Sequence, residues 1–275
     1  MFYGIGYGCG YVLKNPDKKK TFFVVLSILI GVIFVLDMNA ILLFMNLVVG
    51  VLISIFVFQY VFNNTKNIIL SIMLVGMINF LYSVLRHFLF YNTYRKIIDL
   101  SLEQNITMIE SYFKNSPEKI ENAKILLESF SGILVNYSIS LWTVAIVLGL
   151  ASGSLVLSRN IKANYEIKSI KVPYFLVYGL ISGLSLFIFP TTRNFGSNIV
   201  ISISSLYLIQ GISIALFFWW DYITRSKVLM WMTILAILMN PYILILITLV
   251  GIADIWFDIR KLNKSEEKNE NNPNE

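Results

Sequence analysis

Residues 40–62 read AILLFMNLVVGVLISIFVFQYVF and contain no Asp, Glu, Lys or Arg. An apolar run of about 18 or more residues is long enough to cross the hydrocarbon core of a bilayer as one α-helix. The stretch therefore predicts a transmembrane helix. Comparable apolar runs recur along the chain, so the fold is decided by how many of them cross.

The composition excludes an ordinary soluble domain. Hydrophobic residues make up 57% of the chain and charged residues 14%, and the mean hydropathy is +0.72, whereas a typical soluble domain has about 25% charged residues. The net charge of +6 comes from basic residues in short loops between apolar runs. That placement sets membrane orientation, so we expect no nucleic-acid partner and a lipid bilayer as the surroundings.

The apolar runs predict an all-α fold, a polytopic transmembrane helical bundle of about eight spans. The expected spans cover residues 21–36, 40–62, 67–90, 131–157, 172–190 and 197–219, with two short spans in 227–257. Proline disfavours helix in the residue before it, so Asn240-Pro241 is expected to join the last two spans. Residues 1–13 are too short to span and predict a partial helix. We expect one transmembrane domain, 1–261, followed by a disordered cytoplasmic tail, 262–275.

Residues 92–130 are polar but keep helical periodicity. One apolar face comprises Ile98, Leu102, Ile106, Ile109 and Phe113, and a second comprises Ile120, Ala123, Leu127 and Phe130. The second helix is expected to begin with Ser116 as N-cap, Pro117 in the first position and Glu118 in the first turn. Two interpretations remain open: an amphipathic pair lying along the membrane surface, or a helical hairpin packed on the spans.

Charge bias predicts the orientation, because short loops rich in Lys and Arg stay on the cytoplasmic side. Loops 14–20, 63–66, 158–171 and 221–227 and the tail all fall inside if 227–257 crosses twice. The chain is therefore expected in a bacterial plasma membrane with its C-terminus in the cytoplasm and 92–130 outside.

This topology gathers polar residues near the outer mouths of the spans. They are Asp37, Asn39, Arg86, His87, Arg193, Asn194, Asn240 and Tyr242. We select Arg86, His87, Arg193, Asn194 and Asn240 as candidate ligand-binding residues. Loop ends are generally polar, so the alternative is that these residues lie near one another by chance and form no pocket. In that case His87 is a residue at the membrane interface.

Charged residues also meet at the inner end of the last span. Asp254 and Asp258 lie one helical turn apart, Arg260 follows, and Arg225 is expected at the same level. An ionisable group inside the membrane costs free energy, so its presence suggests a function. The cluster predicts either an ion-paired helix end or a docking surface for a cytoplasmic partner.

Isolated polar and small residues within the spans predict helix packing. Asn79, Asn136, Asn198 and Gln210 are expected to form hydrogen bonds across helices. Ala145, Gly149 and Gly153, and also Gly179 and Gly183, recur at four-residue spacing and predict close helix approach, within the chain or with a second protein.

One histidine and one cysteine, Cys9, cannot assemble a convincing catalytic or metal site. We therefore expect no enzymatic activity, no catalytic residue, no metal and no cofactor.

The last third of the chain resembles the YybS-like bacterial membrane proteins, a family without an established function. The likeness lies in Val172-Pro173, Gln210-Gly211, Asn240-Pro241 and the closing pattern Gly251-x-x-Asp254-x-Trp256-Phe257-Asp258-x-Arg260-Lys261. The family's plan is similar to that of the substrate-binding subunits of energy-coupling-factor transporters. The resemblance implies a small-molecule-binding transporter subunit, with an unknown ligand and with partner membrane subunits or an ATPase. The alternative hypothesis is a structural scaffold of the cell-envelope or division machinery.

Overall fold

The computed structural model describes residues 38–114, 116–158, 170–223 and 240–261, together with 226, 228 and 232. The elements in this part of the chain are α3 (Met38–Leu47), α4 (Ser54–Thr65), α5 (Ile68–Tyr112), α6 (Pro117–Asn136), α7 (Ser138–Ser158), α8 (Leu176–Ile188), α9 (Arg193–Ile223) and α11 (Pro241–Phe257). A π-helical stretch, Val48–Ile53, joins α3 to α4 without a break. The all-α prediction is confirmed for these residues.

Three helical segments in the described ranges are long and apolar enough to cross a membrane: Leu42–Thr65, Ile68–Tyr112 and Arg193–Trp219. A fourth arises if α6 and α7, bent by 77° at their junction, count as one broken span. Helices α8 and α11 are apolar but shorter. The expected eight spans are therefore more than the structure shows. The expected segments 1–13 and 21–36, most of 227–239 and the tail lie outside the described residues.

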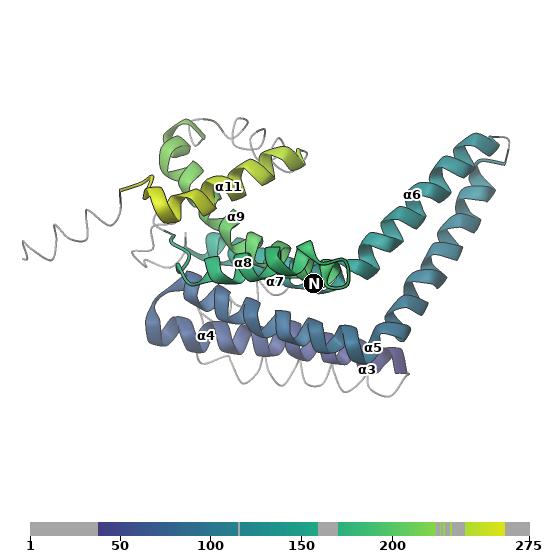
Figure 1. The fold of residues 1–275 in the computed structure, drawn as a ribbon, viewed down its shortest axis with the longest axis horizontal. Coiled ribbons are helices and arrows are strands. Elements are labelled where there is room, and N and C mark those ends of the chain that lie inside the picture. The colour runs from purple at the N-terminus through teal and green to yellow at the C-terminus, as the bar shows by residue number, and fades with distance from the viewer. Residues whose placement is uncertain are drawn as a thin grey trace, which may run out of the picture.

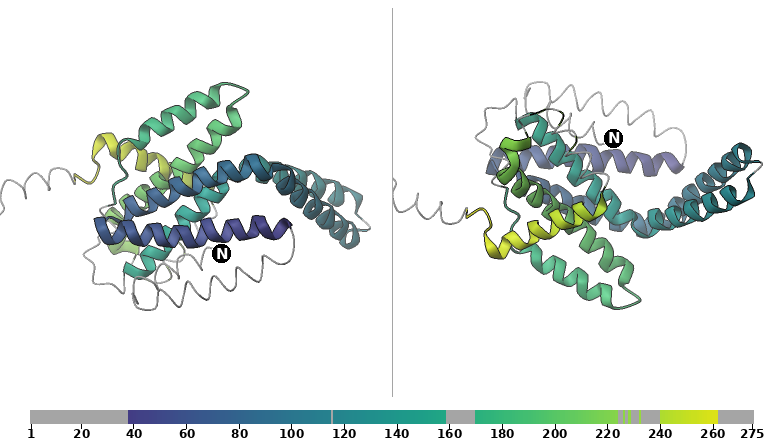
Figure 2. Two further views of the ribbon diagram at one scale, coloured as in Figure 1. Left: turned by 90° about the horizontal axis from the view of Figure 1, so that it is seen from below. Right: turned by 90° about the horizontal axis from the view of Figure 1, so that it is seen from above.

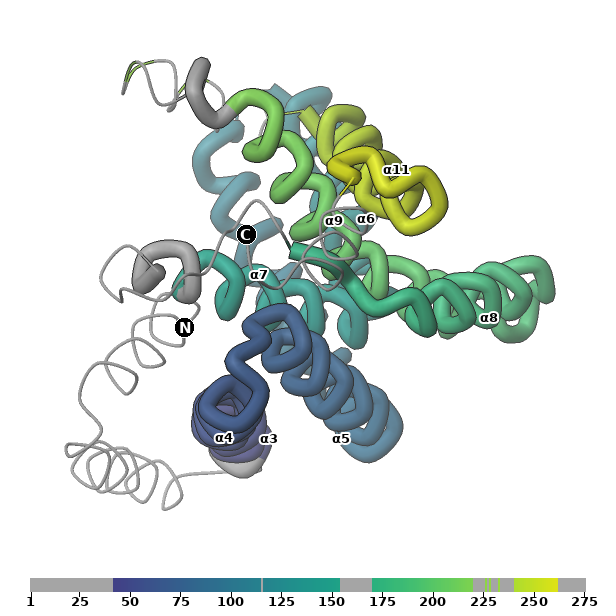
Figure 3. Tube along the Cα trace, turned by 90° about the vertical axis from the view of Figure 1, so that its left-hand side faces the viewer, coloured from purple at the N-terminus to yellow at the C-terminus, as the bar shows by residue number. Residues whose placement is uncertain are grey.

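The bundle is built around α5, α7 and α9. Helix α4 returns into α5 through a tight turn, where Lys66 adopts a left-handed conformation and the Asn67 side chain caps α5 by accepting from Leu70 N. Helix α5 packs on α4 and α7, and α9 contacts α7, α8 and α11 (Figure 3). Phe58, Ile72 and Tyr207 are among the fully buried side chains that fill the core between these helices.

The structure extends one helix well beyond its predicted end. The expected span 67–90 continues as α5 to Tyr112, with a kink at Phe90 where the backbone leaves helical geometry. Residues 91–114 and 116–136, here called the arm, project from the bundle as the far part of α5 and the returning α6 (Figures 1 and 2). The expected span 131–157 is likewise divided, because α6 ends at Asn136 and α7 begins at Ser138.

The two amphipathic faces predicted in 92–130 face each other along the arm. Ile98 is buried and most other residues of the two faces are half-buried, whereas Phe113 and Phe130 stay exposed. The arm is thus a helical hairpin, but it leaves the spans instead of packing on them. Helix α6 starts at Pro117 as expected. The Ser116 side chain makes no capping hydrogen bond, however, and its backbone carbonyl accepts from Lys119 and Ile120 instead.

Glycines allow the closest helix crossings in the bundle. A Cβ on Gly251 would overlap the carbonyl oxygen of Tyr207, and one on Gly211 would overlap that of Ile247, so α9 and α11 meet backbone to backbone. Gly179 and Gly183 likewise face side chains of α9. The close approach predicted at Gly179 and Gly183 is therefore confirmed, as packing within the chain.

Candidate functional site

Arg86 is held at the base of the arm by two helix partners. Its guanidinium donates to Asn46 Oδ1 at 3.1 Å and to the Ser138 carbonyl at 3.3 Å. It also lies over the Trp142 ring, 4.7 Å from the centroid. Tyr82 Oη donates to the same Asn46 oxygen at 2.8 Å. These contacts tie α3, α5 and α7 together where the arm begins.

A series of hydrogen bonds continues from Trp142 into the core of the bundle. Trp142 Nε1 donates to Asn79 Oδ1 at 3.1 Å, and Asn79 Nδ2 donates to Ser54 Oγ at 2.8 Å. Ser54 Oγ in turn donates to the Val49 carbonyl inside the π-helical stretch, at 3.0 Å. Asn79 is fully buried. The predicted cross-helix role of Asn79 is thus confirmed, and the π-helical turn supplies the acceptor at the end of the chain.

Asn198 joins α9 to the break between α6 and α7. Its Oδ1 accepts from Ser140 N at 2.8 Å, and its Nδ2 donates to the carbonyls of Asn136 at 2.8 Å and Asn194 at 2.7 Å. The cross-helix prediction is confirmed for Asn198. Asn136 takes part through its backbone carbonyl. Close by, His87 Nδ1 lies 3.0 Å from Ser138 Oγ.

The structure places the predicted outer-mouth residues in different surroundings. Arg86 and His87 share Ser138 as a partner, and Asn194 is linked to the same region through Asn198. Arg193 is exposed beside the Phe187 ring, and Asn240 is an exposed N-cap of α11. Asp37 and the Asn39 side chain lie outside the described residues. Ligand binding by these residues stays a prediction.

A second buried polar cluster joins the middle of α9 to the end of α11. Asp254 Oδ2 accepts from Gln210 Nε2 at 2.9 Å and from Arg260 Nη2 at 2.8 Å, and its Oδ1 accepts from Ile259 N at 2.8 Å. Arg260 also donates to Ser213 Oγ at 2.9 Å and to the Ile170 carbonyl at 2.8 Å. Every charge in this cluster meets an opposite charge or a hydrogen-bonding group, which is what burial of charges demands.

The end of α11 brings these groups together through its backbone. Asp258 adopts a left-handed conformation with φ 39°, which ends the helix and turns the chain back, so that Arg260 reaches Asp254. Asp258 itself lies 3.4 Å from Lys171 Nζ. The ion pairing predicted at this helix end is present. Docking of a partner stays a prediction, and Arg225 lies outside the described residues.

Sequence reasoning missed the partners that complete this cluster. Gln210 was expected to bond across helices, and it does, but it bridges two segments: it donates to Asp254 and accepts from Val172 N at 2.8 Å. Ser213 and the Ile170 carbonyl were not identified. The sequence does carry one signal for Ser213. It lies three residues after Gln210 and hence on the same face of a helix.

An apolar cavity of about 380 Å³ lies among α5, α7, α8 and α9. Its lining comprises Met73, Leu74, Gly76, Met77, Phe80, Thr143, Val147, Phe175, Leu176, Gly179, Ile199, Ser202, Ile203 and Leu206. None of these side chains is charged. Figure 3 shows α5 and α8 diverging on one side of α7 and α9, and the cavity lies between them.

Two hydroxyl groups are the polar side chains of this cavity. Thr143 Oγ1 donates to the Ile139 carbonyl of its own helix at 3.0 Å. Ser202 is 5% exposed, and its buried Oγ has no hydrogen-bond partner. At the rim, Met77 and Phe175 are 61% and 56% exposed. The cavity is therefore open at its edge, and the Ser202 hydroxyl is not exposed to it.

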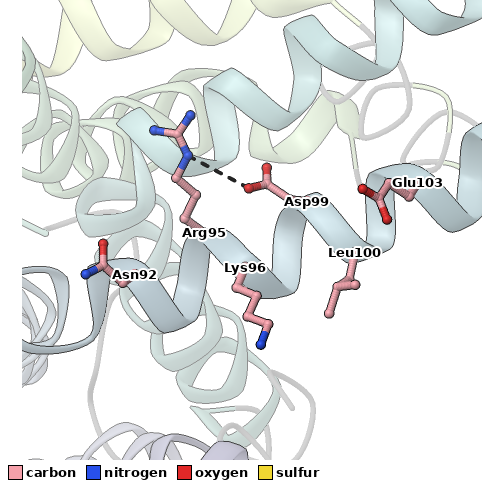
Figure 4. A pocket seen from close by; sticks show the side chains of 6 residues that line it. All are labelled: Asn92, Arg95, Lys96, Asp99, Leu100 and Glu103. Carbon is pink, nitrogen blue, oxygen red and sulfur yellow. Dashed lines mark ion pairs between the residues drawn. The ribbon is translucent and has the colours of Figure 1, made fainter.

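A second hollow lies on the arm and is lined by residues of α5 alone. Figure 4 shows its side chains, Asn92, Arg95, Lys96, Asp99, Leu100 and Glu103. Arg95 and Asp99 approach to 3.9 Å, but both side chains are more than half exposed, so water and salt screen their attraction. An open hollow on one helix is a poor ligand site, because it buries little of a ligand's surface.

Across the described residues, no group of three or more His, Cys, Asp or Glu side chains is arranged to hold a metal ion. A family model described as predicted membrane protein (DUF2232) matches residues 10–255. No match was found among curated proteins or among solved structures.

Proposed function

We propose, since the chain belongs to the family described as predicted membrane protein (DUF2232), that it is a membrane-embedded binding protein for a small molecule. The ligand occupies the cavity among α5, α7, α8 and α9. The observation that carries the proposal is the cavity itself. Its volume of about 380 Å³ falls within the range of about 300–1,000 Å³ that ligand pockets have.

The position of the cavity supports binding rather than a packing defect. Side chains in protein interiors interdigitate and leave few voids larger than a single water molecule. Here residues of four helices contribute to the wall. Sites between the helices of a bundle are a common location for ligands.

A role as a transporter subunit extends this proposal. Such a subunit needs a surface for its partners, and the end of the bundle opposite the arm offers one. Trp256 and Phe257 are exposed there beside the Lys171–Asp258 pair. Exposed aromatic residues next to charges suit either a membrane interface or a partner surface, so partner capture from this end tests the extension.

The arm favours a second candidate function, a scaffold of the cell envelope. Leu126, Phe130 and Ile133 lie at helical spacing on α6 and are exposed. Contiguous exposed apolar residues mark interaction surfaces. Photocrosslinkers at Phe130 and Phe257 in cells separate the two functions. Capture of an ATPase from Phe257 supports the transporter subunit, and capture of cell-wall enzymes from Phe130 supports the scaffold.

The binding proposal is tested by closing the cavity mouth. Met77→Trp places a large side chain at the exposed rim, where it need not disturb the core. Leu85→Trp is the matched control, because Leu85 is 60% exposed on the same helix and does not line the cavity. Native mass spectrometry of the protein released from lipid nanodiscs should show a bound small molecule in the wild type and in Leu85→Trp, and its loss in Met77→Trp. A wild type without any bound molecule, or equal binding in all three proteins, contradicts the proposal.

A further inference from the structure

We infer that the cavity takes the end of a lipid's hydrocarbon chain, which enters sideways near the middle of the bilayer while the headgroup stays at the membrane surface. This inference rests on the proposed function, and it adds the ligand's chemical class and the part of the ligand that the protein contacts. It commits the cavity to a membrane lipid, rather than to a water-soluble molecule or a further helix.

The side chains of the lining offer no charge and no free hydrogen-bond donor. None of them is ionisable. Of the two hydroxyl groups, Thr143 Oγ1 donates to the Ile139 carbonyl of its own helix at 3.0 Å, and the Ser202 hydroxyl is not exposed to the cavity. A polar group that entered would lose its hydrogen bonds to water without adequate replacement. The enclosed part of the ligand is therefore hydrocarbon.

The size of the cavity excludes a helix as its occupant. One turn of an α-helix with its side chains is about 10–12 Å wide and about 5.4 Å long, which corresponds to about 420–610 Å³. The cavity has a volume of about 380 Å³, less than that of a single turn. A hydrocarbon chain is one carbon atom wide, with a contact distance of about 4 Å to its neighbours. A single chain therefore fits where a helix does not.

The depth of the cavity identifies the part of a lipid that reaches it. Met77, at the exposed rim, lies eleven residues after Lys66 and nine before Arg86. At about 1.5 Å per residue these intervals are about 17 Å and about 14 Å, and together they match the hydrocarbon thickness of about 30 Å. Arg86 lies beside the rings of Trp142 and Tyr94, as expected at a membrane interface. The rim is thus near the bilayer midplane, where chain ends lie and headgroups do not.

The rim also gives the lipid access. Met77 and Phe175 are both exposed, and they lie on α5 and at the start of α8. Met77 belongs to a segment that is long and apolar enough to cross the membrane, so its exposed side chain contacts lipid chains. Because lipid chains are as apolar as the cavity lining, a chain end enters without passing through water.

Photolabelling in lipid nanodiscs tests the inference. Two phosphatidylglycerol probes carry a diazirine in one acyl chain, either at the chain end or next to the ester, and the labelled residues are mapped by mass spectrometry. The reference surface is Leu246 and Leu249, which are exposed near the middle of α11 and do not line the cavity. We expect the chain-end probe to label the lining of α7 and α9 several-fold more strongly than this surface. The ester-side probe should show no such preference.

Two further arms of the experiment isolate the cavity and the headgroup. Met77→Trp should reduce chain-end labelling of α7 and α9 to the level of the α11 surface, because the indole covers the rim. Leu85→Trp, the matched exposed substitution on α5 outside the cavity, should leave the labelling unchanged. Phosphatidylethanolamine in place of phosphatidylglycerol should give equal labelling, since the headgroup lies outside the cavity. The comparison of the two probes uses the wild type, so it decides the matter even if a variant fails to fold.

The outcomes separate this inference from the proposed function. Equal labelling of the lining by both probes, or labelling that changes with the headgroup, overturns the assignment of the chain end. If native mass spectrometry then still finds a bound molecule that Met77→Trp removes, the proposed function survives. Crosslinks from the lining to residues 1–37 of the same chain would overturn both, since a segment of the protein would then fill the space.

Discussion

Replacement of Arg260 by methionine removes the buried cation that neutralises Asp254. Arg260 donates hydrogen bonds to Asp254 Oδ2, Ser213 Oγ and the Ile170 carbonyl, at distances between 2.8 and 2.9 Å. Both side chains of the ion pair are 0% exposed. Removing one partner of a buried pair leaves an uncompensated charge and costs about 3–5 kcal/mol of unfolding free energy.

The Lys171–Asp258 pair provides the matched control on the same helix end. Its atoms are 3.4 Å apart, and its side chains are 33% and 22% exposed. Lys171→Met should therefore cost about 1 kcal/mol or less, because solvent screens the attraction. The assay is equilibrium unfolding in mixed micelles, followed by tryptophan fluorescence.

A double-mutant cycle then isolates the buried pair. Asp254→Asn removes the charge and keeps one acceptor oxygen, which can accept from Ile259 N but leaves Gln210 Nε2 without its acceptor. The double variant with Arg260→Met should lose less than the sum of the two single losses, by about 0.5–3 kcal/mol. Additive losses, or equal losses for Arg260→Met and Lys171→Met, would refute the claim that this buried pair stabilises the end of α11.

Three further outcomes follow from other contacts. Gly251→Ala should destabilise the bundle by about 1–3 kcal/mol or more, because a Cβ there overlaps the Tyr207 carbonyl oxygen; thermal unfolding in micelles measures this loss. Asn198→Leu should cost about 1–3 kcal/mol by leaving buried backbone groups unpaired, and faster hydrogen exchange at the start of α7 is the check. The Glu110 carboxylate, 2.8 Å from Lys124, raises the pKa of that amine. Their contact should thus hold the arm together below the ordinary lysine pKa of 10.5 and weaken as pH rises through the raised value, seen as a wider distance distribution between spin labels on α5 and α6.

The apolar runs were sufficient to predict the helices but not where each would bend. Nothing in the residues around Phe90 interrupts a helix, since no glycine or proline lies nearby, and the amphipathic period runs on from the span into the arm. The kink at Phe90 and the break at Tyr137 depend on tertiary contacts, notably those of Arg86 with Ser138. Such contacts join residues about 50 positions apart, and a local pattern carries no information on them.

The residues of the candidate sites were likewise predictable from the sequence only in part. Asn79, Asn198 and Gln210 were predictable, because an isolated amide in an apolar span must find a hydrogen-bond partner. Ser202 was not, since Ser197 and Ser205 are the same residue type in the same helix and differ from it only in their contacts. The cavity depends on which neighbouring side chains leave space, and this emerges only from the packing of four helices.

The arm can act as a lever, because α5 runs from the cavity wall through the kink at Phe90 into the arm without an intervening loop. Residues Tyr91 to Tyr112 extend about 33 Å at the helical rise of about 1.5 Å per residue. The opposite half of the same helix forms part of the cavity wall. A rotation of α5 by about 10° about the arm's base would therefore carry the tip through about 6 Å, so a change in cavity filling too small to detect within the bundle would register as a displacement at the far end of the arm.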